Sequence, residues 1–190
     1  MTRQEIKAKA REQLGGNIFS TNWVMALLAL LIVSLLNSII PGIAAIVLSG
    51  PLAVGAALLF TSLARGEGEV RLEKLFDPFT TDFVGTFLLG LFMTLFTALW
   101  TLLFIIPGVV KRYAYAMAPY IKADHPEMDA MTCIKESQKL MNGHKMDFFI
   151  LQLSFIGWLI VGALCCGIGT LFVAPYMEAS KANFYESIKA

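Results

Sequence analysis

The feature that most constrains the fold of this chain is the spacing of its charged residues. No Asp, Glu, Lys or Arg lies between Glu12 and Arg65, and two further uncharged runs extend over residues 83–110 and 148–177. A helix needs roughly 20 mostly apolar residues to cross a bilayer, and each run is long enough for that. A soluble domain has about 25% charged residues, whereas this chain has 15% and a mean hydropathy of +0.68. The sequence therefore predicts an all-α, polytopic helical membrane protein.

Turn-forming residues divide the uncharged runs into helical hairpins. The run after Glu12 is about twice as long as one span, so it must fold back, and Pro41-Gly42 is the expected turn. Pro107-Gly108 and Gly167-Ile168-Gly169 are the corresponding turns later in the chain. We predict six transmembrane helices in a single membrane domain, paired as hairpin 1 over residues 23–64, hairpin 2 over 83–122 and hairpin 3 over 147–187.

A proline recurs in the second helix of each predicted hairpin. Pro51, Pro119 and Pro175 each follow a small residue and precede a large apolar one. They are expected to kink these helices, because a proline removes one helix hydrogen bond. The shared placement indicates an internal repeat and supports residues 109–121 and 171–185 as spans, although both are short. The alternative explanation is that proline is common in membrane helices generally.

Two polar segments, residues 1–22 and 126–144, are each predicted to contain an amphipathic helix, over 2–14 and 130–141. Thr2 and Glu5 have the spacing of a capping box. The apolar faces consist of Ile6, Ala10 and Leu14 in the first helix and Ala130, Met131, Ile134 and Met141 in the second. We expect both helices to lie on the cytoplasmic leaflet, where apolar burial and basic residues favour membrane contact. The alternative for the first is an ordinary solvated helix.

The distribution of basic residues predicts the topology. Of the 15 Lys and Arg residues, all except Lys111 and Arg112 occur in segments 1–21, 65–82, 122–145 and 181–190. Six spans with a cytoplasmic N-terminus place all four segments on the cytoplasmic side, where Lys and Arg are enriched in membrane proteins. Without the fourth span, the basic segment 122–145 would lie outside. Both termini are therefore predicted to be cytoplasmic.

The sequence contains no H-E-x-x-H, G-x-S-x-G, G-x-x-x-x-G-K-[ST] or G-x-G-x-x-G motif, and the net charge of +1 gives no basic field for nucleic acid. We therefore expect no enzyme activity, no metal site and no cofactor. Cys133 with His125 or His144 could form a thiol dyad, but no spacing fixes their geometry, and Cys165-Cys166 lies in a predicted outer turn. The expected partners are membrane lipids, with a second copy of the chain or another membrane protein as a further candidate.

Sequence matches distributed along the chain resemble a known family. They are Arg3-Gln4-Glu5-Ile6-Lys7, Gly50-Pro51-Leu52, Pro107-Gly108-Val109-Val110-Lys111, Leu140-Met141-Asn142-Gly143-His144-Lys145, Leu153-Ser154-Phe155-Ile156-Gly157-Trp158 and Pro175-Tyr176. The chain resembles the bacterial integral membrane family catalogued as domain of unknown function 975. This resemblance implies location in a bacterial cell membrane and supplies no activity. A more distant likeness is to the membrane domain attached to some glycerophosphodiester phosphodiesterases, whose catalytic domain this sequence lacks.

Four charged residues within the predicted spans form the candidate site. Glu178 lies well inside the sixth predicted helix, and Lys181 follows one turn later. An ionisable side chain at that depth is costly and indicates function. Alternatively, the last helix is short and tilted, and both residues emerge at the inner interface. Lys111 and Arg112 lie early in the fourth helix, where they either extend to the outer surface or pair with Glu178.

These observations favour a non-enzymatic transporter, channel or lipid-handling module built around a partly polar centre. Proline-broken helices near the middle of the bilayer often form transporter sites. The alternative is a membrane scaffold or accessory subunit whose cytoplasmic amphipathic helices dock a partner. A cavity that reaches Glu178 would favour the first function, and a closed apolar core would favour the second.

Overall fold

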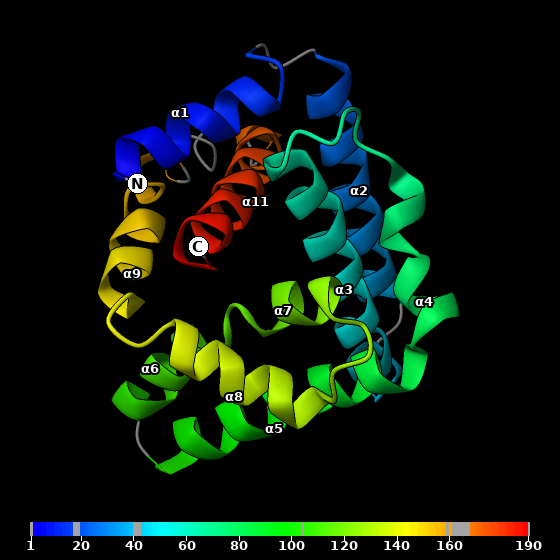
Figure 1. Ribbon diagram of the computed structural model, residues 1–190, viewed down its shortest axis with the longest axis vertical. Helices are drawn as coiled ribbons and strands as arrows, with labels where there is room; N and C mark the ends of the chain where they lie inside the picture. The colour runs from blue at the N-terminus through cyan, green and yellow to red at the C-terminus, as the bar shows by residue number, and fades with distance from the viewer. Residues whose placement is uncertain are drawn as a thin grey trace.

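A computed structural model describes residues 2–16, 20–39, 43–103, 105–158, 160 and 168–189, and in these ranges all regular structure is helical, as predicted (Figure 1). The elements are α1 (Arg3–Gln13), α2 (Thr21–Ile39), α3 (Ile43–Ala64), the 3₁₀ helix η1 (Leu72–Leu75), α4 (Asp77–Thr81), α5 (Phe83–Leu103), α6 (Ile105–Tyr115), α7 (Ala118–Asp124), α8 (Ala130–Leu140), α9 (Lys145–Leu153) and α11 (Ile168–Lys189).

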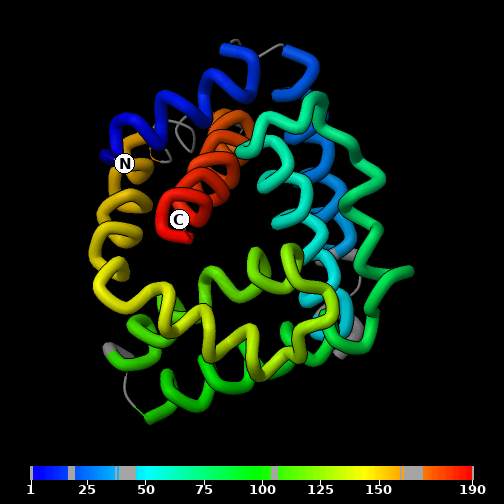
Figure 2. The backbone as a smooth tube through the Cα atoms, viewed as in Figure 1, coloured from blue at the N-terminus to red at the C-terminus, as the bar shows by residue number. Residues whose placement is uncertain are grey.

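The N-terminal helix forms for the reason expected from its sequence. The Thr2 hydroxyl accepts a hydrogen bond from the Glu5 amide, and the Glu5 carboxylate accepts one from the Thr2 amide, so the capping box is complete. Gly15 and Gly16 follow the helix with positive φ angles, which end it at little steric cost. Figure 2 shows α1 lying across α11, against which it packs.

Both amphipathic helices bury their apolar faces inside the protein. Ile6, Ala10 and Leu14 of the α1 segment are buried, and so are Ala130, Ile134 and Met141 of the α8 segment. The α8 helix, capped by the Asp129 side chain, packs on α5 and α7. The expectation that these apolar faces rest on the membrane surface is therefore wrong, because other helices already cover them.

The α3 helix packs against α5, α7 and α11, which come from later parts of the chain. Its crossing with α5 requires glycine on both helices. A Cβ atom added to Gly90 would lie 2.5 Å from Gly50 Cα, and one added to Gly50 would lie 2.1 Å from the Thr86 carbonyl oxygen. The two backbones therefore touch, which is a geometry that membrane helix pairs with small residues at their contact also adopt.

The prolines of the three predicted hairpins occupy different positions in their helices. Pro51 and Pro175 lie inside α3 and α11 as expected. Pro119 instead lies in the first turn of α7, where its missing N–H costs nothing, so the prediction of an internal proline is wrong there. Pro107 also lies in a first turn, that of α6, so Pro107-Gly108 is part of a helix and the prediction of a turn at these two residues is wrong. The other two predicted turns fall partly or wholly outside the described residues.

The break between α6 and α7 is stabilised by a side chain of α8. The Ser137 hydroxyl donates a hydrogen bond to the Ala114 carbonyl (2.8 Å) and accepts one from the Met117 amide (3.2 Å). Ser137 is fully buried, so these bonds satisfy backbone groups that water cannot reach. The fourth predicted span is thus a discontinuous helix.

In the described part of the chain, two helical stretches are long and apolar enough to cross a membrane, Ile46–Ala64 in α3 and Phe83–Leu103 in α5. They differ in burial: 61% of the α3 stretch is buried inside the protein, but only 11% of the α5 stretch. Thr21–Leu36 in α2 is a shorter apolar helix. The predicted span 148–166 begins with α9, which ends at Leu153 before a turn at Ser154, and 161–167 lie outside the described residues.

Candidate functional site

A cavity of about 860 Å³ lies among the helices, lined by residues from α2, α3, α5, α6, α7, α9 and α11. The α3 helix contributes small residues to its wall, including Ala53, Ala56 and Ala57. Because these side chains end at a methyl group, they leave space that larger residues would fill. The small-residue surface of α3 therefore has two roles, close helix contact at Gly50 and an open wall at the alanines.

An ion pair on α11 faces the cavity. Lys181 Nζ lies 2.7 Å from Glu178 Oε1, and their side chains are 26% and 27% exposed. Glu178 is near the middle of α11, whose 22 residues span about 33 Å, close to the thickness of a bilayer core. The last helix is therefore not short, and the neutralising partner of Glu178 is Lys181 rather than Arg112 or Lys111.

Arg112 lies on α6 and lines the same cavity as Glu178 and Lys181. The α6 and α11 helices make no extended contact in the described structure, so the cavity separates Arg112 from the ion pair. Among the described residues, no carboxylate lies within 4.0 Å of the Arg112 guanidinium, and its side chain has no hydrogen-bond partner. The structure thus brings three of the four predicted site residues to one cavity, with Arg112 unpaired.

Lys111, the fourth predicted site residue, points elsewhere. Its ammonium nitrogen lies 5.1 Å from the centroid of the Trp100 ring on α5, a distance typical of a cation–π contact. Lys111 does not line the cavity. Adjacent residues on α6 therefore have different surroundings, Lys111 against an aromatic ring and Arg112 at the cavity.

A network of charges joins the C-terminal ends of α3, α7 and α11. Asp124, whose side chain is 7% exposed, accepts hydrogen bonds from Arg65 (2.7 Å), Tyr185 (2.8 Å) and Lys189. The Tyr185 ring stacks on Tyr120, which lines the cavity, at a centroid distance of 5.4 Å. This network therefore contacts the cavity wall through Tyr120 and connects the ends of helices from all three predicted hairpins.

The pKa of Asp124 determines when this network is charged. Burial raises the pKa of the Asp124 carboxyl, but hydrogen bonds from Lys189, Tyr185 and Arg65 outweigh burial and hold the pKa below its ordinary value. A lowered folded-state pKa stabilises the fold above about pH 4, the ordinary Asp value. That stabilisation is lost as the pH falls from there through the lowered pKa.

We expect Asp124→Asn to lower the free energy of unfolding at pH 7 by about 1–3 kcal/mol, because it weakens a buried charged hydrogen-bond network. The variant should also lose part of the acid-dependent destabilisation that the lowered pKa of Asp124 predicts for the wild type. The measurement is thermal unfolding in neutral detergent at pH 3–7, with the exposed Asp147→Asn as the control. An Asp124→Asn protein with wild-type stability and an unchanged acid response would contradict this assignment.

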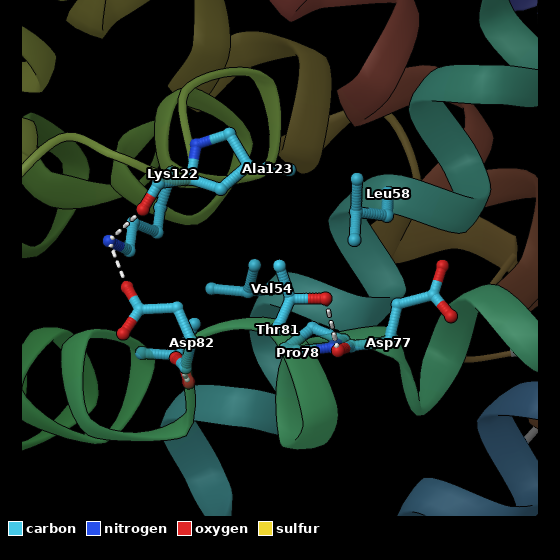
Figure 3. Close-up of a pocket in the computed structure, with 10 residues that line it drawn as sticks. Val54, Leu58, Asp77, Pro78, Thr81, Asp82, Lys122 and Ala123 are labelled. Carbon is cyan, nitrogen blue, oxygen red and sulfur yellow. Dashed lines mark hydrogen bonds and ion pairs between the residues drawn. The ribbon is translucent and has the colours of Figure 1, made fainter.

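A second polar cluster, which the sequence did not reveal, surrounds Lys122 (Figure 3). Lys122 begins the polar segment 122–145 of the sequence, yet its side chain is 2% exposed. Its ammonium group donates to the carbonyl oxygens of Pro126 (2.7 Å) and Met128 (2.6 Å) and to the Asp82 carboxylate (2.6 Å). The neighbouring cavity of about 190 Å³ lies beside a lysine whose donors are all used, so this cluster is structural.

Asp82 also fixes the start of α5. Its second carboxylate oxygen accepts a hydrogen bond from the Gly85 amide (2.9 Å), while the bond from Lys122 is the main cause that lowers the pKa of Asp82. A Cβ atom on Gly85 would lie 2.1 Å from that carboxylate. In the sequence, only the position of Lys122 directly after an apolar run hinted at this buried pair of Lys122 and Asp82.

The proposed thiol dyad is absent from the described structure. Cys133 is buried, and burial raises the pKa of its thiol to about 11, so it is not a reactive thiolate near neutral pH. His125 lies near Glu127 and His144 near Asp147, and the Cys133 thiol donates to the Met128 carbonyl instead of a histidine. Among the described residues, no group of three or more His, Cys, Asp or Glu side chains could hold a metal ion. Cys165 and Cys166 lie outside them.

The described structure is that of an all-helical protein with charged residues at the wall of an open cavity between its helices. The chain belongs to the family described as "Protein of unknown function (DUF975)", which it matches over residues 1–112 and 103–190. These two ranges together cover the whole chain and confirm the family resemblance. No match was found among curated proteins, and none among solved structures.

Proposed function

We propose that this chain is a multi-pass protein of the bacterial cell membrane that binds a ligand in its central cavity, as a non-enzymatic transporter-like or lipid-handling module. The observation that carries the proposal is the cavity of about 860 Å³, which has Arg112, Glu178 and Lys181 at its wall. Ligand sites in proteins typically enclose about 300–1,000 Å³ and combine apolar walls with a few convergent polar groups.

The exposure of α5 supports a membrane location. Its apolar stretch is mostly unburied, and its exposed side chains include Val84, Leu95, Leu99, Leu102 and Leu103. Soluble monomers rarely expose contiguous apolar patches larger than a few hundred Å². A lipid environment would remove these side chains from water, and this is the physical reason for placing α5 in a bilayer.

In this proposal six segments cross the membrane, with both termini in the cytoplasm. The segments are α2, α3, α5, the broken helix α6–α7, the segment that begins with α9, and α11. The Asp124 network and the basic loops then lie together on the cytoplasmic side, in agreement with the positive-inside bias. The discontinuous fourth segment and the mid-helix ion pair beside the cavity resemble the way many transporters form their binding sites.

The scaffold alternative has less support. It required cytoplasmic amphipathic helices with apolar faces available to a partner, but Ile6 of α1 and Ile134 of α8 are buried within the protein. A docking partner would have to bind the remaining polar surfaces. The cavity gives the ligand-binding function a specific location that the scaffold function does not have.

Thiol accessibility tests the cavity directly. Ala53 lines the cavity and is exposed there, so Ala53→Cys, in a protein whose native cysteines are replaced, should react with a small water-soluble methanethiosulfonate. The matched control is Leu102→Cys on α5, where Leu102 is 84% exposed but should face lipid and remain unlabelled. If Ala53→Cys in membranes reacted as slowly as Leu102→Cys, no water-filled cavity would reach α3, and the proposal would be wrong.

A further inference from the structure

We infer that the cavity binds a phosphate-bearing amphiphile, with its anionic head at Arg112 and its apolar portion along the cavity walls. This inference rests on the proposed function and specifies its ligand class. It follows from the charges, the unused hydrogen-bond donors and the composition of the cavity wall.

The charges at the cavity do not balance. Glu178 and Lys181 neutralise each other across 2.7 Å, which leaves Arg112 as the one lining cation without a carboxylate partner in the described structure. The Arg112 side chain is exposed in the structure, so its guanidinium is free to meet a ligand at the cavity wall. A ligand with one negative group would supply a counter-charge.

The available donors match the chemistry of phosphate. The Arg112 guanidinium and the Gln152 side chain both line the cavity, and within the described ranges neither side chain has a hydrogen-bond partner. A guanidinium can present two parallel N–H groups to a phosphate, which makes the contact both strong and directional. Gln152 adds an amide donor from α9. A metal cation is disfavoured at the same place, because the nearest lining charge is positive.

The remaining wall is suited to an apolar chain. Leu30 and Val33 of α2, Met93 of α5 and Val109 of α6 line the cavity together with the α3 alanines. An inorganic anion would leave this apolar surface in contact with water, whereas an acyl chain would cover it and gain from the burial of apolar area. The apolar wall therefore favours an amphiphile over a free anion.

Binding measured on the purified full chain in neutral detergent tests the inference. The probes are dioctanoyl phosphatidic acid, dioctanoylglycerol (which lacks the phosphate) and inorganic phosphate, titrated by isothermal calorimetry. We expect phosphatidic acid to bind with one molecule per chain and at least about tenfold tighter than either other probe, because only it uses both the guanidinium and the apolar wall.

Two variants locate the head group. Arg112→Gln should weaken phosphatidic acid binding by about tenfold or more and leave dioctanoylglycerol binding unchanged. Lys111→Gln, the neighbouring cation that lies against Trp100, should leave both unchanged. Arg112→Lys, which keeps the charge but loses the two-pronged contact, should fall between wild type and Arg112→Gln. Thermal unfolding of each variant verifies that it is folded.

Several outcomes would overturn the inference. Equal loss in Arg112→Gln and Lys111→Gln would mean that general surface charge, not the cavity, attracts the phosphate. Inorganic phosphate that binds as tightly as phosphatidic acid would indicate a simple anion site, without the amphiphile. If no probe bound while Ala53→Cys still reacted with the water-soluble reagent, the ligand class would be wrong and the proposed cavity function would remain.

Discussion

Gly90→Ala is expected to destabilise the protein by more than about 3 kcal/mol, at or beyond the upper end of ordinary overpacking. The added Cβ would lie 2.5 Å from Gly50 Cα and 2.7 Å from Gly50 N, and these are backbone atoms that cannot rotate away. The α3 and α5 helices would have to separate, and α3 also packs against α7 and α11. Thermal unfolding in detergent, followed by size-exclusion chromatography, measures the loss.

The matched control is Gly157→Ala. A Cβ atom at Gly157 would have no neighbour within 4 Å, and the residue is helical. This change should be neutral or stabilise by roughly 0.5–1 kcal/mol, because alanine loses less backbone entropy than glycine in a helix. If Gly90→Ala and Gly157→Ala unfolded at the same temperature, the close contact between α3 and α5 would not exist.

Lys122→Met should lower the free energy of unfolding by about 3–5 kcal/mol, the range for removing one partner of a buried ion pair. The change leaves the Pro126 and Met128 carbonyls without their donor and leaves Asp82 without its cation. The loop that contains Pro126 and Met128, between α7 and α8, and the start of α5 should both loosen. Hydrogen exchange of the loop, together with urea or thermal unfolding in detergent, provides the measurement.

Lys135→Met is the control, since Lys135 is exposed on α8 and its replacement should change stability by no more than about 0.5 kcal/mol. Asp82→Asn tests the same ion pair from the side of the carboxylate, because the hydrogen bond from Lys122 lowers the pKa of Asp82. The lowered pKa stabilises the folded protein above about pH 4, and this stabilisation is lost as the pH falls through the lowered pKa of Asp82. A Lys122→Met protein as stable as Lys135→Met would show that Lys122 is solvated.

Local signals in the sequence predicted local structure well. The Thr2–Glu5 capping box and the glycines after Leu14 define α1, and the stripe that includes Ile134 defines α8. These features depend on residues three or four positions apart, which a helix always brings together. What the sequence did not show was the partner of each apolar face, because an apolar stripe packs equally well against a membrane or another helix.

The sequence predicted which charged residues form the candidate site, but not how they pair. Their positions within apolar helices singled out Glu178, Lys181 and Arg112 as candidate site residues, and the structure places all three at one cavity. The partner of Glu178 was left open among Lys181, Arg112 and Lys111, since depth gives no rotation about the helix axis. Lys122 was missed because its burial depends on a loop and on Asp82, which is remote in sequence.

The prolines did not show from the sequence alone whether they lie inside a helix or at its start. Inside a helix a proline removes a hydrogen bond, and in the first turn it removes nothing, so its sequence context alone does not distinguish the two. Pro51 lies inside α3, whereas Pro119 begins α7. The difference depends on Ser137 of α8, which satisfies the backbone at the break.

The central claim, six spans with both ends in the cytoplasm, is tested most directly by labelling single cysteines in intact cells with a membrane-impermeant maleimide. In a background without the native cysteines, Gly42→Cys and a reinstated Cys165 should be labelled from outside. Glu69→Cys and Lys139→Cys should be labelled only after the cells are lysed; both positions are exposed, so the reagent can reach them. Labelling of Lys139→Cys from outside would show that α6–α7 does not cross the membrane, and would contradict the three-hairpin topology.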